Sequence, residues 1–265
     1  MYTKKQRIAA ISALLAQNPN RLYSLEYFQK LFGAAKSSIS EDIAVLRQSL
    51  EELGGGKLQT VAGPHGGVRL LPVMPLQAKD RLCDELIREM SDSSRILPGG
   101  FIYLADLFYT PRFADGMAQM MAEWFYGTKA DLVATIETKG IPLAMGVARL
   151  LNLPVAIARR DVKPTDGPVF SINYLSGSSR RLQTMSLSRR MVREGARAVV
   201  IDDFISGGGT LKALCGLLAE FKIEVEGIGV AIVNKYPQKK KIKQFQALFL
   251  LEELSESHID LISYK

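Results

Sequence analysis

The sequence predicts an α/β protein made of two parts, a small helical module with a β-hairpin and a larger part with a mostly parallel sheet. The 265 residues are enough for two domains. Three amphipathic helical segments come first, and strand-like and helix-like segments then alternate along the rest of the chain. The segment LLPVMPLQ, residues 70–77, breaks both patterns, so we expect domains of 1–73 and 74–265.

Composition and charge limit the classes to which the protein can belong. Hydrophobic residues make up 47% of the chain, and no apolar run reaches the ~20 residues that cross a bilayer, so we expect a globular, cytoplasmic protein without membrane contact. The formal net charge of +7 favours polyanionic partners, either nucleic acid or phosphorylated metabolites. Two cysteines and two histidines without metal-type spacing argue against a zinc site and a histidine-based triad.

Three helical segments open the chain. Residues 4–16 have apolar side chains at helical spacing, and residues 25–32 form a second amphipathic run that ends at a glycine. We expect the third helix at 41–53, capped by Ser38 or Ser40. Its buried face would consist of Ile43, Leu46, Leu50 and Leu53, with Arg47 and Gln48 facing outward.

The strand-like runs 57–63 and 67–72 follow, joined by a turn containing proline and glycine. Three helices followed by a β-hairpin are typical of a winged helix-turn-helix, whose third helix enters the major groove of double-stranded DNA. The expected DNA-binding residues are Arg7, Lys36, Ser37, Ser38, Arg47 and His65, with Lys4 and Lys5 near the DNA backbone. The alternative is a small helical module whose basic side chains are merely solvated.

The larger part alternates strands and helices, which predicts a largely parallel sheet flanked by helices. The expected strands are 101–108, 131–137, 155–160, 168–175, 198–204 and 227–233. The expected helices are 79–91, 112–126, 140–151, 184–194 and 210–221. Ligands of such sheets bind at the carboxyl ends of the strands, so the residues just after each strand matter most.

The run AVVIDDFISGGGT, residues 198–210, carries the clearest chemistry. A buried strand leads to Asp202 and Asp203, whose carboxylates can accept hydrogen bonds from two ribose hydroxyls. The loop Ser206, Gly207, Gly208, Gly209 and Thr210 then opens a helix, where backbone N–H groups and the helix dipole favour a phosphate. The run therefore predicts a site for a ribose 5-phosphate.

This run resembles the signature with which type I phosphoribosyltransferases bind 5-phosphoribosyl-1-pyrophosphate (PRPP). By the same resemblance, Thr138, Lys139 and Gly140 occupy the place of the pyrophosphate loop, and Arg159 and Arg160 that of a further phosphate-facing strand end. Residues 174–190 occupy the place of a mobile hood loop. The arginines at 180–193 would close over pyrophosphate, extend a DNA-binding face, or simply be solvated.

With both parts taken together, the chain resembles the family of purine operon repressors of Gram-positive bacteria. The resemblance implies a homodimer that binds operator DNA, represses purine biosynthesis genes and is released by PRPP as effector, with or without Mg²⁺. It implies no required cofactor, no catalytic residue and no resident metal. The alternative is a purine phosphoribosyltransferase enzyme; an RNA-binding attenuator would leave the winged helix unexplained.

Phe204 departs from the enzymes, which usually have a small or acidic residue after the paired acids. An aromatic ring there can stack on a purine or fill the space of an acceptor base. Tyr103 is expected to line the same site, although a buried structural role is the alternative for both. An aromatic pair would suit the guanine nucleotide (p)ppGpp as a competitor of PRPP. No hood segment for an acceptor base is recognisable in residues 80–110.

Overall fold

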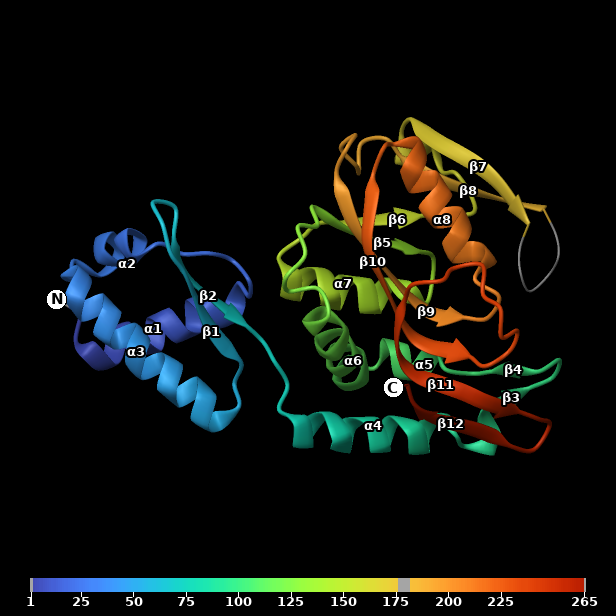
Figure 1. Ribbon diagram of the computed structural model, residues 1–265, viewed down its shortest axis with the longest axis horizontal. Helices are drawn as coiled ribbons and strands as arrows, with labels where there is room; N and C mark the ends of the chain where they lie inside the picture. The colour runs from blue at the N-terminus through green and yellow to red at the C-terminus, as the bar shows by residue number, and fades with distance from the viewer. Residues whose placement is uncertain (1, 176–181, 265) are drawn as a thin grey trace. The chain divides into compact units, whose positions relative to one another are not determined.

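The computed structural model describes residues 2–175 and 182–264. Contacts group the chain into two compact units, one of residues 1–79 with 149–152 and one of 80–148 with 153–265. Figure 1 shows the helices and strands of each unit. Among the described residues, no helix is both long and apolar enough to cross a membrane.

The first unit contains the predicted three helices and hairpin. Its elements are α1 (Lys4–Gln17), α2 (Leu25–Phe32), α3 (Lys36–Leu53), β1 (Lys57–Val61) and β2 (Gly67–Leu71), the two strands being antiparallel. α2 begins and ends as predicted, because the Ser24 hydroxyl accepts a hydrogen bond from the Tyr27 N–H and Gly33 adopts a left-handed conformation. One core of aromatic and aliphatic side chains, including Phe28 and Ile39, joins the five elements.

The third helix is longer than predicted. It begins at Lys36, its N-cap is Ala35, and neither Ser38 nor Ser40 caps it. The sequence interpretation missed that Ile39 already belongs to the buried stripe, four residues before Ile43. At the other end, Leu53 is 85% exposed, so it lies outside the core.

A buried ion pair joins α1 to α3. The Arg7 guanidinium donates from Nε to Asp42 Oδ2 at 2.6 Å and from Nη2 to Asp42 Oδ1 at 3.3 Å. The Asp42 side chain is completely buried, and Arg7 also donates to the carbonyl of Tyr2. Arg7, which was predicted to bind DNA, therefore has a structural role within this unit.

The second unit contains a six-stranded sheet in the order β12-β11-β10-β9-β5-β6. All neighbouring strands are parallel except β12, which pairs antiparallel with β11 at one edge. The strands are β5 (Leu132–Ile136), β6 (Val155–Ala158), β9 (Arg197–Ile205), β10 (Glu224–Asn234), β11 (Gln246–Leu254) and β12 (Ile259–Ser263). β5 is buried along its whole length, as expected for a central parallel strand covered on both faces.

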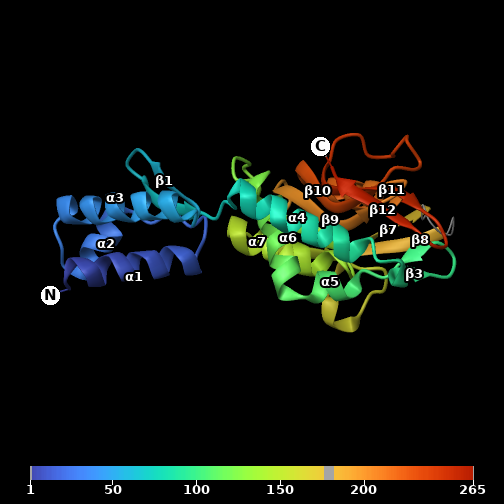
Figure 2. The ribbon, with the colours of Figure 1, turned by 90° about the horizontal axis from the view of Figure 1, so that it is seen from below.

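Helices and two hairpins surround this sheet (Figures 1 and 2). The helices are α4 (Leu76–Met90), α5 (Ala105–Tyr109), α6 (Pro111–Glu123), α7 (Gly140–Leu151) and α8 (Gly209–Glu220), with short 3-10 helices at Ser93–Arg95 and Pro164–Asp166. The hairpins are β3 (Ile96–Leu97) with β4 (Phe101–Ile102), and β7 (Val169–Leu175) with β8 (Leu182–Ser188). α6 packs against β10 and β11, whereas α8 packs against β10 and the β7–β8 hairpin.

Several sequence-based boundaries were wrong. Only two residues of the expected strand 101–108 are extended, because Leu104, Leu107 and Phe108 have helical spacing and become buried around α5. The expected helix 184–194 is instead strand β8, in which Met185 and Leu187 alternate into the core. α4 begins at Leu76 rather than Lys79, and strand β11 and the edge strand β12 were not predicted.

The ion pair between α1 and α3 predicts a large and selective loss of stability. Replacing Arg7 with methionine leaves the Asp42 carboxylate buried without its partner, which we expect to lower the free energy of unfolding of the first unit by ~3–5 kcal/mol. Urea denaturation followed by circular dichroism measures this loss.

The matched control is Lys4→Met, because Lys4 lies 4.0 Å from Glu41 and both side chains are exposed. It should change stability by no more than ~0.5 kcal/mol. Equal losses in the two variants would contradict the assignment.

Candidate functional site

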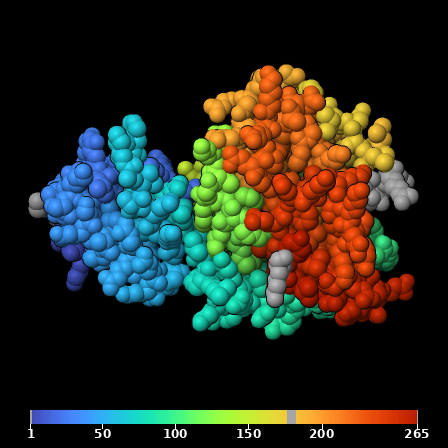
Figure 3. All heavy atoms as spheres, in the orientation of Figure 1, coloured from blue at the N-terminus to red at the C-terminus, as the bar shows by residue number. Residues whose placement is uncertain are grey.

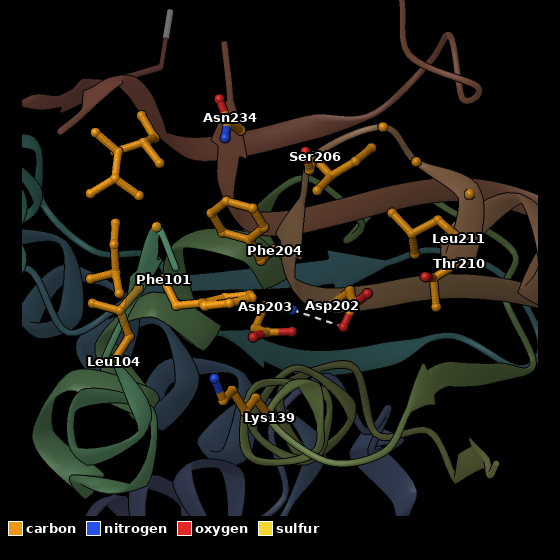
Figure 4. A pocket seen from close by; sticks show the side chains of 18 of the residues that line it. Phe101, Leu104, Lys139, Asp202, Asp203, Phe204, Ser206, Thr210, Leu211 and Asn234 are labelled. Atoms are coloured by element: carbon orange, nitrogen blue, oxygen red, sulfur yellow. Dashed lines mark hydrogen bonds between the residues drawn. The ribbon is translucent and has the colours of Figure 1, made fainter. Parts of the chain in front are cut away.

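A pocket of about 360 Å³ lies where β9 ends and α8 begins (Figure 4). One side is polar and consists of the end of β9 with the loop that follows it: Asp202, Asp203, Phe204, Ile205, Ser206, Gly207, Gly208, Gly209, Thr210 and Leu211. The other side is mostly apolar and comes from residues 100–108, β10 and β11. Both predicted acids and all five predicted loop residues line it, at the carboxyl end of a strand as expected.

The two acids of the pocket have different surroundings. Asp202 is 7% exposed, and its Oδ1 accepts a hydrogen bond of 3.0 Å from the Asp203 N–H. Burial, and next the charge of Asp203, raises the pKa of the Asp202 carboxyl well above its usual range, and the charge of Arg160 opposes this. A carboxyl that keeps its proton more readily offers a donor as well as acceptors, so the pair can meet both lone pairs and protons of a vicinal diol.

The glycine loop is fixed from outside by the segment after β10. Gly208 has a φ of +75° and precedes the first turn of α8. A Cβ on it would lie 3.3 Å from the Ile242 nitrogen, and the Lys241 N–H donates to the Gly207 carbonyl at 2.9 Å. Lys240 is tied down too: its ammonium donates to the carbonyls of Asn234 and Pro237, and burial lowers its pKa. Residues 240–242 therefore help to hold the glycine loop in place.

The predicted pyrophosphate loop reaches the same pocket from β5. Lys139 lines the pocket, and Figure 4 shows its amine directed toward the side on which Asp203 lies. Gly140 has no room for a side chain, since a Cβ would lie 2.6 Å from Thr135 Oγ1 and 2.8 Å from Asp202 Oδ1. The loop and the carboxylate can approach this closely only with glycine at 140. Thr138 is not among the lining residues.

An apolar wall faces the acids, and the sequence interpretation missed it. Gly100, Phe101, Ile102, Leu104 and Phe108 line this side. The sequence does contain a signal for this wall, the dipeptide Gly99-Gly100, which forms a turn with φ angles of +87° and +75°. The apolar residues after it fit neither a strand period nor a helix period throughout. Figure 4 shows the rings of Phe101 and Phe204 on the same side of the acids.

Tyr103 does not line the pocket, contrary to the prediction. It is 48% exposed, and its neighbours in the chain, Ile102 and Leu104, face the pocket instead. Phe101 supplies the aromatic ring that Tyr103 was expected to provide.

The predicted arginines after β6 also lie outside the lining. Arg159 exchanges backbone hydrogen bonds of 2.9 and 2.8 Å with Ser186, and its Nε lies 3.9 Å from Asp166. The Arg160 N–H donates to Glu137 Oε1 at 2.7 Å, which ties the end of β6 to the loop before α7. Of the arginines at 180–193, Arg180 and Arg181 lie outside the described residues.

A second candidate site lies in the first unit, where a groove of about 660 Å³ separates the start of α3 from the hairpin turn. Lys36, Ser40, Arg47, Thr60, Gly63 and Gly66 are among its lining residues. Arg47 donates to Thr60 Oγ1 at 2.7 Å, so it braces helix against hairpin rather than simply facing outward. Ser37 is exposed and Ser38 half-buried at the helix start, and His65 is exposed in the turn, which projects from this unit in Figure 3.

Neither site contains a cluster of side chains suited to binding a metal ion among the described residues. Among the described residues there is no group of three or more histidine, cysteine, aspartate or glutamate side chains that could hold a metal ion.

Comparison with known proteins assigns both units. Residues 3–72 match the family model "Bacterial purine repressor, N-terminal", and residues 106–263 match "Phosphoribosyl transferase domain". The probable purine biosynthesis transcriptional regulator PurR of Streptococcus pneumoniae is 42% identical over 94% of this chain and 90% of the relative. The repressor PurR of Bacillus subtilis is 37% identical over 96% and 89%, and the activator PurR of Lactococcus lactis 34% over 95% and 93%.

Solved structures support the fold of the second unit. An adenine phosphoribosyltransferase from Saccharomyces cerevisiae superposes with a TM-score of 0.54 over 63% of this chain and 97% of the enzyme, at 16% identity. Likeness at this level shows a shared fold and nothing of the enzyme's activity. The relatives that span nearly the whole chain are regulators. The chain therefore belongs to the PurR family of purine biosynthesis regulators, DNA-binding proteins in which a phosphoribosyltransferase fold has a regulatory rather than an enzymatic role.

Proposed function

We propose that this protein represses purine biosynthesis genes as a homodimer on operator DNA, and that PRPP releases the DNA by binding in the pocket at the end of β9. The observation that carries the proposal is the joining of the acid pair to the N-terminus of α8 in one pocket, a combination suited to a ribose that carries a phosphate. Repression is preferred to activation because the N-terminal match is to a repressor model.

Different residues of the pocket would bind different parts of PRPP. The 5-phosphate would bind the backbone N–H groups of residues 206–210, and the ribose hydroxyls would bind Asp202 and Asp203. Lys139 would neutralise part of the pyrophosphate charge. A Mg²⁺ ion arriving with PRPP would take most of its ligands from phosphate oxygens and water, as this ion commonly does.

The aromatic rings of the pocket support a second ligand for the same pocket, the guanine nucleotide (p)ppGpp. Phe101 and Phe204 provide aromatic faces for a purine ring, which PRPP lacks, while the glycine loop would take phosphates of either molecule. Occupation by one would then exclude the other, so (p)ppGpp would compete with PRPP.

On the DNA side, the start of α3 and the hairpin turn carry the proposed contacts. Lys36, Ser37 and Ser38 lie in the first turn of the helix expected to enter the major groove, and His65 lies at the tip of the wing. Arg47 would act by holding the wing against the helix, because its guanidinium is already bonded to Thr60 and to the Leu58 carbonyl.

Removing one acid should weaken the response to PRPP while sparing DNA binding. For Asp203→Ala we expect PRPP affinity to fall by at least about tenfold, which corresponds to ~1.4 kcal/mol. Fluorescence anisotropy on a duplex from upstream of the purine biosynthesis genes, with and without PRPP, measures both properties. Glu220→Ala, at the exposed far end of α8, is the acidic control. The effector proposal is wrong if the Asp203 variant still releases DNA at the parent's PRPP concentration.

The close approach at Gly140 gives a steric test. Gly140→Ala pushes a methyl group against Asp202 and Thr135, so the loop must move, and we expect PRPP affinity measured by calorimetry to fall by about tenfold. The control is Gly216→Ala within α8, where a Cβ meets no atom within 4 Å; helix propensity there favours alanine by ~1 kcal/mol. Unchanged PRPP affinity in Gly140→Ala would mean that this loop is not part of the ligand site.

A phosphate contact by Lys36 predicts a change in salt dependence. Lys36→Ala should weaken DNA binding and reduce the slope of log affinity against log salt concentration by about 1. Lys129→Ala, an exposed lysine of the second unit, should leave that slope unchanged. A parent-like slope for Lys36→Ala would remove this residue from the DNA interface.

A further inference from the structure

Arg95 joins three segments of the second unit through one guanidinium group. Its Nε donates to the Glu89 carbonyl at 2.7 Å, and its Nη1 donates to the Tyr103 carbonyl at 3.1 Å and to Asp106 Oδ1 at 2.7 Å. The side chain is only 13% exposed, and Nη2 lies 3.9 Å from the Glu89 carboxylate. The Tyr103 N–H donates in turn to the Arg95 carbonyl at 2.8 Å, so backbone and side chain of Arg95 hold the same residue.

The interaction between Arg95 and Asp106 favours the charged form of both side chains. Its hydrogen bond with Asp106 raises the pKa of Arg95, and the same bond lowers the pKa of the Asp106 carboxyl. Charge-assisted hydrogen bonds are stronger than neutral ones and restrict geometry more; the Arg95 side chain is 13% exposed and that of Asp106 43%. Arg95 is thus a charged junction that contacts all three segments at neutral pH.

Two of the three segments form the apolar wall of the pocket. Tyr103 lies between the lining residues Ile102 and Leu104, and Asp106 lies in the first turn of α5, which carries the lining residue Phe108. The strands β3 and β4 have two residues each, so few ladder hydrogen bonds hold this hairpin in place. Phe101, at its end, is 61% exposed. The position of the wall therefore depends on the contacts of Arg95.

The third segment is the last turn of α4. Glu89 is the penultimate residue of this helix, and its carbonyl belongs to the unsatisfied helix end that Arg95 caps. α4 begins at Leu76, directly after the hairpin module of the first unit, and is the helix through which the chain passes into the second unit. Figure 1 shows the β3–β4 hairpin beyond the end of α4, and Figures 1 and 2 show α5 beside the helix.

We propose that Arg95 is a positioning residue that links the apolar wall of the pocket to the end of α4, so that a ligand bound in the pocket changes the stability of this connecting helix. The inference rests on the proposed function and adds to it the route by which the pocket acts on the DNA-binding module. Arg95 is not a lining residue of the pocket; it transmits the difference in free energy between the occupied and the empty pocket.

The test compares the full-length parent with Arg95→Met and with the matched control Arg112→Met. Arg112 also pairs with a carboxylate of α4, that of Glu85, but its side chain is exposed and does not contact the wall. Two measurements are made with PRPP at a concentration that calorimetry shows to be saturating for each variant. One is the ratio of DNA dissociation constants with and without PRPP, and the other is amide hydrogen exchange with and without PRPP.

In the parent and in Arg112→Met, PRPP should raise the DNA dissociation constant by about tenfold or more, within the usual range of coupling between sites. It should slow amide exchange both at residues 206–210 and in the last turn of α4. In Arg95→Met, protection at 206–210 should remain, while protection of α4 is lost and the DNA ratio falls to about twofold or less. Because a purely structural role would lower thermal stability without changing this ratio, the ratio separates the two roles.

A parent-like DNA ratio in Arg95→Met would overturn the inference. So would loss of protection at 206–210 in that variant, because Arg95 would then support ligand binding alone. Should Arg95→Met fail to fold, Asp106→Asn removes the charged partner while leaving the cap on Glu89, and the same ratio decides. If PRPP does not change the DNA dissociation constant of the parent protein, the proposed function is wrong, and so is the inference that rests on it.

Discussion

The contact between Asp202 and Gly140 is the constraint around which the ligand pocket is built. Asp202 sits at the buried end of β9, and the loop after β5 passes so close to its carboxylate that no side chain fits. Two loops from neighbouring parallel strands are thereby held at one point. The polar half of the pocket follows from that packing, because the glycine loop and Lys139 are carried on the same two strands.

Sequence reasoning found the polar half of the site and missed the apolar half for a physical reason. Asp202, Asp203 and residues 206–210 are consecutive in the chain, so their chemistry is visible as one run with a strand before it and a helix after it. The wall comes from β4, α5 and β11, and its members are ordinary apolar residues that any core would contain. Only the folded chain brings them to face the acids.

The sequence-based predictions failed where an element is very short or where a residue's role depends on a distant contact. A two-residue strand followed by a five-residue helix has too few repeats to reveal its period, which is why 101–108 was taken for one strand. The extension of α3 to Lys36 depends on the burial of a single additional residue, Ile39. Similarly, the role of Arg7 depends on Asp42, a residue 35 positions away that spacing alone does not connect to it.

The ion pair between Arg7 and Asp42 also affects how strongly DNA binding should depend on salt concentration. Binding to DNA is driven in part by the release of condensed counterions, one for roughly each phosphate that a protein cation neutralises. An arginine whose charge is already neutralised inside the fold releases none. The count of 34 lysines and arginines therefore overstates the number of ions displaced, and complexes of this protein should tolerate salt better than that count alone suggests.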